Sequence, residues 1–78
     1  MNSTTTETIG TGDKLANGAT VIAVRPYSSW PRDGVVFLAL WRDELVTWVG
    51  EPDGSGTTWG HYFPDGDIAA AVADWQTR

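Results

Sequence analysis

The stretch from Val35 to Gly50, VVFLALWRDELVTWVG, constrains the fold most, because it is apolar on both faces of any strand that it forms. We interpret it as two strands joined at Arg42-Asp43-Glu44, a polar connection of hairpin length. A sheet with one solvated face would alternate apolar and polar residues, so these strands need cover on both sides. Alternation sorts the first strand into Val35, Phe37, Ala39 and Trp41 on one face and Val36, Leu38 and Leu40 on the other.

A helix near the C-terminus supplies one cover. The run from Ile68 to Gln76 is rich in Ala, and Asp65 or Asp67 can cap its first turn. For the second face three candidates stay open: the segment from Ile9 to Thr20 folded back, curling of the sheet into a partial barrel, or a second protein chain. The apolar stripe that we expect to pack on the sheet consists of Ile68, Val72 and Trp75.

Two further strands flank the hairpin in the sequence. Thr20 to Tyr27 is β-branched and ends at Pro26, which is typical of an edge strand. Thr57 to Phe63 alternates aromatic and small residues, and Asn17-Gly18 is a strong turn signal. The sequence therefore predicts an α+β fold, with an antiparallel meander of four to five strands and one C-terminal helix packed on it.

The chain has room for one small domain. It has 78 residues, and we expect residues 1 to 8 to be a flexible tail before a single domain over residues 9 to 78. There is no Cys and only one His, His61, so we expect no disulfide, no metal site and no bound cofactor. Stability must come from dense packing of the aromatic residues.

The charge balance disfavours nucleic acid and membranes as partners. Ten Asp and Glu against five Lys and Arg give a net charge of −5, which opposes binding to phosphates. No run approaches the roughly 20 apolar residues that span a bilayer, so we expect a cytoplasmic protein. Carboxylates at turns and on the helix surface, Asp74 among them, leave an acidic DNA mimic as an alternative.

No catalytic signature stands out. His61 is the only imidazole base, and Ser28, Ser29 and Ser55 are the serines that could approach it, but none lies in a nucleophile-elbow sequence. The paired acids lie in turns, where backbone hydrogen bonding and helix capping explain them. We therefore expect a non-enzymatic protein.

The sequence resembles a family of phage proteins in three runs and a final helix. The runs are NGATVIAVRP, VFLALWRDELVTWV and TTWGHYF, followed by an Ala-rich helix with a late aromatic and basic end. Over about residues 17 to 78 this resembles small uncharacterised proteins of actinobacteria-infecting phages, of the mycobacteriophage type. The resemblance implies a small phage protein made in a bacterial host, and it implies no activity and no site residues.

Five tryptophans indicate where a partner would bind. Small domains depend on burial, so we expect about three in the core and one or two at a surface. The leading hypothesis is an interaction module for a host or phage protein, or for a second copy in a homodimer. The alternative is a small nucleic-acid-binding protein that stacks bases on aromatic rings and contacts phosphates through Arg25, Arg32 and Arg42. The candidate partner-binding residues are Trp30, Trp41, Trp48, Trp59 and Leu38.

Overall fold

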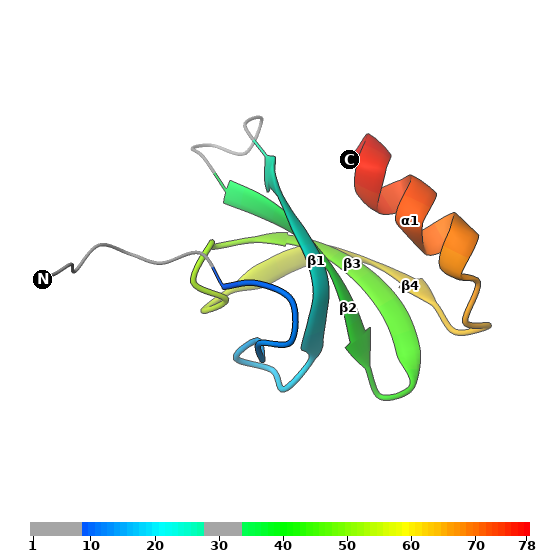
Figure 1. Ribbon diagram of the computed structural model, residues 1–78, viewed down its shortest axis with the longest axis horizontal. Coiled ribbons are helices and arrows are strands. Elements are labelled where there is room, and N and C mark those ends of the chain that lie inside the picture. Colours follow the sequence, from blue (N-terminus) through cyan, green and yellow to red (C-terminus); the bar gives the residue numbers. More distant parts are fainter. Residues whose placement is uncertain (1–8, 28–33) are drawn as a thin grey trace, which may run out of the picture.

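The computed structural model describes residues 9–27 and 34–78, and it shows the predicted α+β class (Figure 1). The sheet order is β1-β2-β3-β4 with antiparallel neighbours, so the meander is confirmed and the sheet stays open. The expected tail, residues 1 to 8, lies outside the described residues. The elements are β1 (Thr20–Tyr27), β2 (Gly34–Trp41), β3 (Glu44–Gly50), β4 (Thr57–Phe63) and α1 (Ile68–Thr77).

The central hairpin forms with the expected two-residue turn. Arg42 and Asp43 connect β2 to β3, and their φ angles of 52° and 67° are those of a type I′ turn. Phe37 faces Trp48 across the two strands, and Ala39 faces Val46. Alternation along the hairpin therefore sorted its side chains correctly between the two faces of the sheet.

The helix α1 covers the first of these faces, which we call the helix face. Ala71 is fully buried there against Leu38 and Leu45, with Val72 and Trp75 packed beside them. Ile68 was expected in this contact but is 67% exposed, because it is the first residue of the helix and the buried stripe begins one turn later at Ala71.

Hydrogen bonds fix both ends of the helix. At its start the Asp67 carboxylate accepts a hydrogen bond from the backbone N–H of Ala70 at 3.0 Å, so Asp67 is the N-cap. Near its end the indole N–H of Trp75 donates to the carbonyl of Val36 at 2.9 Å. The Arg25 side chain in turn donates to the Trp75 carbonyl at 2.7 Å, so β1 and β2 both hold this turn.

The opposite face is partly covered by residues 9–19, which we call the strap (Figure 1). Leu15 and Ala19 are buried in one cluster with Phe37 and Val46, and Ile9 packs against that cluster. Of the three candidates for the second cover, the folded-back N-terminal segment is the one that the structure shows. We call this side of the sheet the strap face.

Backbone hydrogen bonds anchor the strap at both sides of the sheet. Gly12 and Asp13 bond to the backbone of Val21 on edge strand β1, each at 2.8 Å. At the other side the N–H of Ala16 donates to the Gly54 carbonyl in the β3–β4 loop at 3.0 Å. Gly54 has a φ of 78°, and a Cβ there would lie 2.6 Å from the Ile9 side chain, so only glycine fits under the strap.

Among the described residues, no helix has the length and apolar character needed to span a membrane.

We predict that Leu15→Ala lowers the free energy of unfolding by about 2 to 5 kcal/mol, the range for truncating a buried leucine. Leu15 is 3% exposed, although it lies outside every strand and helix. The neighbouring Ala16 is exposed, so Ala16→Ser is the control and should change stability by less than about 0.5 kcal/mol. Urea denaturation measures both variants. Equal, small effects would mean that the strap contributes little to the core.

Candidate functional site

A polar network, which we call the docking network, joins the helix to strands β3 and β4 on the helix face. The Thr47 hydroxyl donates to the Asp74 carboxylate, and Nδ1 of His61 lies 3.0 Å from both oxygens of that carboxylate. Arg78 donates to the carbonyl and hydroxyl oxygens of Thr47 at 2.9 and 3.1 Å, and its other terminal nitrogen donates to the Trp59 carbonyl. The network thus ties α1 to β3 and β4.

Within the described residues the contacts of this network dock the helix on the sheet, and none of them joins a hydroxyl group to His61. A catalytic hydroxyl must contact its base, but the Thr47 hydroxyl is fully buried and bonds to Asp74 instead of His61. Ser55, the one candidate serine among the described residues, belongs to a loop turn in which its N–H donates to Asp53. Within that same part of the chain, no three acidic or His side chains gather to hold a metal ion.

Asp74 is a structural carboxylate. We expected it on the helix surface, but its side chain is only 24% exposed, because the helix turns it toward Thr47 and His61. Burial raises the pKa of Asp74, but hydrogen bonds from Thr47 and His61 and the positive charge of Arg78 outweigh it, so the net shift of the pKa is downward.

Three aromatic rings pack together on the strap face, next to the strap. The ring centroids of Trp41 and Trp48 are 5.5 Å apart, and Tyr62 lies 6.2 Å from each. Trp48 is buried beneath the other two rings, whereas Tyr62 is 49% exposed. The Trp41 indole N–H donates to the Asn17 carbonyl at 3.3 Å, which fixes that ring to the strap. We call Trp41, Trp48 and Tyr62 the aromatic surface.

The edge strand β4 is distorted where it passes this surface. Two residues, Trp59 and Gly60, stand opposite Trp48 in the β3–β4 pairing, which makes a β-bulge. A Cβ on Gly60 would lie 2.7 Å from Nε1 of Trp48 and 2.9 Å from the Tyr62 ring, so these rings pack on bare backbone. Trp59 has a φ of 54°, a strained value for a bulky residue, and it is 56% exposed.

The predicted partner-binding residues divide between surface and core. Trp41 contributes to the aromatic surface and Trp59 is exposed beside it on β4, but Trp48 is buried beneath the surface. Leu38 was assigned wrongly, because it is 4% exposed and lies under the helix. Trp30 lies outside the described residues.

Sequence reasoning missed Tyr62 as a member of the surface. It reaches Trp48 only because Tyr62 pairs with Val46 across β3 and β4. The bulge at Trp59 sets that pairing, and no pattern in the sequence of β4 indicates a bulge. Its aromatic character was therefore the only available signal.

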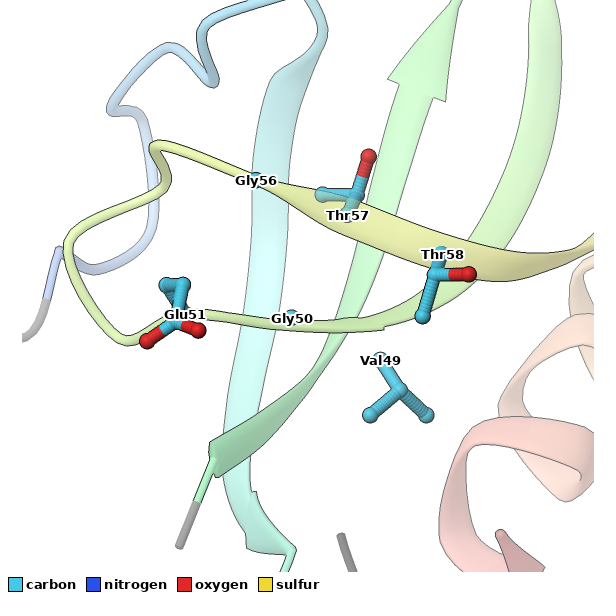
Figure 2. Close-up of a pocket in the computed structure, with 6 residues that line it drawn as sticks. All are labelled: Val49, Gly50, Glu51, Gly56, Thr57 and Thr58. Atoms are coloured by element: carbon cyan, nitrogen blue, oxygen red, sulfur yellow. The ribbon is translucent and has the colours of Figure 1, made fainter. Parts of the chain in front are cut away.

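A small hollow lies beside the loop that joins β3 to β4, where Val49 and Thr58 face each other (Figure 2). Its volume of about 220 Å³ is below the roughly 300 to 1,000 Å³ of small-molecule sites. Among the described residues that line it, Glu51 is the ionisable one. The described lining residues are Val49, Gly50, Glu51, Gly56, Thr57 and Thr58.

We predict that Trp59→Gly is more stable than Trp59→Ala by about 1 kcal/mol, the cost of a left-handed conformation for a residue with a Cβ. Glycine is ordinarily worse than alanine in a strand, so this order isolates backbone strain from lost side-chain contacts. Thermal and urea unfolding of both variants measure the difference. If Trp59→Ala is the more stable variant, the bulge relaxes at no cost and the strain is absent.

We predict that Asp74→Asn reduces the loss of stability between pH 7 and pH 3. A carboxyl group whose pKa is lowered by folding stabilises the protein above its unfolded pKa of about 3.9, and this stabilisation is lost as the pH falls through the folded value. Urea denaturation at the two pH values gives the loss for each protein. Asp43→Asn, in the exposed turn, is the control and should lose as much stability as the unsubstituted protein.

Comparison of the chain with protein-family models, with curated proteins and with solved structures gave no match. Two features of the structure bear on the function of the chain: the docking network under the helix and the aromatic surface beside the strap.

Proposed function

We propose that this chain is a non-enzymatic interaction module that binds another protein through the aromatic surface, with Trp59 of the neighbouring bulge as a further contact. On the resemblance described above, the partner is a protein of the bacterial host or of the phage. The observation that carries the proposal is the partial cover of the strap face. The strap buries the cluster around Phe37 and stops short of Tyr62.

The exposed aromatic residues have the properties of interface anchors. Large aromatic side chains dominate the binding energy of protein interfaces, above all when neighbouring packing keeps them rigid. Trp41 is held by Trp48 and by its hydrogen bond to the strap, and Tyr62 packs edge-on against Trp48. Such rings lose little conformational freedom when a partner covers them.

Strain at Trp59 adds to this argument. A bulky residue with a positive φ persists only where its surroundings impose that conformation, and such residues gather at functional sites. Here the Arg78 side chain bonds to the Trp59 carbonyl, while Gly60 receives the Trp48 ring. The protein therefore maintains a strained backbone at the place where it exposes a tryptophan.

The basic residues support a protein partner over nucleic acid. Arg25 is engaged with Trp75 on the helix face, and its guanidinium is 6.0 Å from the centroid of that ring. Arg78 is committed to Thr47 and Trp59. Arg42 lies over the Trp41 ring, and Arg32 is outside the described residues. Few cations are left to contact phosphates.

We predict that Tyr62→Thr weakens capture of the partner from host lysate about tenfold, because it removes the exposed ring and keeps a residue suited to a strand. Ile22→Thr is the matched control: Ile22 is 39% exposed on β1, the opposite edge of the sheet from β4. Quantitative mass spectrometry should show at least one protein that Ile22→Thr retains and Tyr62→Thr loses by about tenfold, equivalent to 1.4 kcal/mol.

Two outcomes would contradict the proposal. Identical capture by both variants would mean that the aromatic surface contacts nothing. Binding to single-stranded DNA that requires Tyr62, with no protein captured, would favour the nucleic-acid alternative. Sedimentation of the purified protein and of Tyr62→Thr tests whether the partner is a second copy of the chain. A dimer that Tyr62→Thr dissociates would identify it as such.

A further inference from the structure

We infer that the partner presents a basic segment, rich in Arg or Lys, which lies on the aromatic surface beside Glu44. This inference rests on the proposed function and specifies the chemistry of its partner. Three observations support it: a cation already seated on Trp41, carboxylates at the rim of the surface, and the internal use of two arginines.

The aromatic surface accepts a cation within the protein itself. The guanidinium carbon of Arg42 lies 4.5 Å from the centroid of the Trp41 ring, within the distance of a cation–π contact. Arg42 occupies the first turn position with a φ of 52°, where asparagine or glycine is usual. Arg42 is thus an unfavourable residue for the backbone of this turn position, but from this position its side chain reaches the Trp41 ring.

Carboxylates border the same rings. Glu44 stands directly across from Trp41 in the β2–β3 register, so both side chains lie on the strap face. Asp43 is exposed next to it in the turn. Within residues 9–27 and 34–78 neither carboxylate forms an ion pair, so both can receive cations from outside.

The distribution of charge over the whole surface favours the same class of partner. Arg25 and Arg78 make their hydrogen bonds inside the protein, which leaves Lys14 and Arg42 as the exposed cations of the described residues. Such an acidic surface attracts basic segments and repels nucleic acid and a second copy of the chain. Among the described residues the exposed aspartates are Asp13, Asp43, Asp53, Asp65 and Asp67.

A titration with defined peptides tests the inference. The probe is a ten-residue peptide of alternating Arg and Gly, and the comparison ligands are the same peptide with Glu for Arg and a ten-residue oligothymidine. Tryptophan fluorescence at low ionic strength follows binding, since the rings are the proposed contact. We expect the Arg peptide to bind and the two anionic ligands to give no saturable signal.

Variants locate the binding. We expect Tyr62→Thr to weaken the Arg peptide about tenfold, and Tyr62→Phe, which keeps the ring, to bind like the unsubstituted protein. Glu44→Gln should weaken it about threefold, as for one partly exposed charge pair. The matched control is Asp53→Asn in the β3–β4 loop, which removes the same charge, keeps an acceptor for the Ser55 N–H and should have almost no effect.

Each contrary result has one reading. If Asp53→Asn weakens binding as much as Glu44→Gln, the attraction is general and no basic site lies beside Glu44. Equal or tighter binding of either anionic ligand overturns the inference directly. If the Arg peptide does not bind while capture from lysate still depends on Tyr62, the basic partner is wrong and the proposed function stands. If capture is also independent of Tyr62, both fall.

Discussion

Burial of both faces of one hairpin is the constraint on which the rest of this structure depends. The strands β2 and β3 carry apolar side chains on each side, and a chain of 78 residues has little left with which to cover them. The helix covers part of one face through Ala71 and leaves Leu40 on that face 46% exposed, and hydrogen bonds hold its last turns to the sheet. The strap seals part of the other face through Leu15 and ends the cover beside Trp41. On the strap face this partial cover leaves Tyr62 49% exposed, and it is there that we propose the surface for a partner.

Local patterns predicted the elements and the hairpin register well, because those depend on residues close in sequence. A two-residue turn at Arg42 and Asp43 decides which side chains share a face, and alternation does the rest. The predictions failed where distant segments meet. Leu38 was expected at a binding surface and is buried, whereas Ile68 was expected against the sheet and is exposed. The position of the helix on the sheet decides which residues it buries. Asp74 has a polar neighbour, Thr47, that is 27 residues away, so its role could not be inferred from the helix alone.

Bulges were the other obstacle, since each shifts the alternation of a strand. In β1 the extra residue Ile22 has no partner in β2, so Val21 lies under the strap and Ala23 packs on the helix face. In β4 the pair Trp59 and Gly60 does the same opposite Trp48. Among the described residues the non-glycine residues with positive φ are Arg42, Asp43 and Trp59, and all of them lie in the turn or the bulge that borders the aromatic surface. Backbone strain is thus concentrated around the proposed contact.

The two faces of the sheet are not independent, and Arg78 is the residue that connects them. Its guanidinium donates to Thr47, inside the docking network, and to the carbonyl of Trp59, in the bulge under the Trp48 ring. A helix that leaves the sheet would withdraw this donor from Trp59. The strained bulge would then lose a contact that stabilises it, because a left-handed residue persists only while its surroundings impose that conformation. The Arg78 side chain therefore links the docked helix on one side of the sheet to the bulge that borders the aromatic surface on the other.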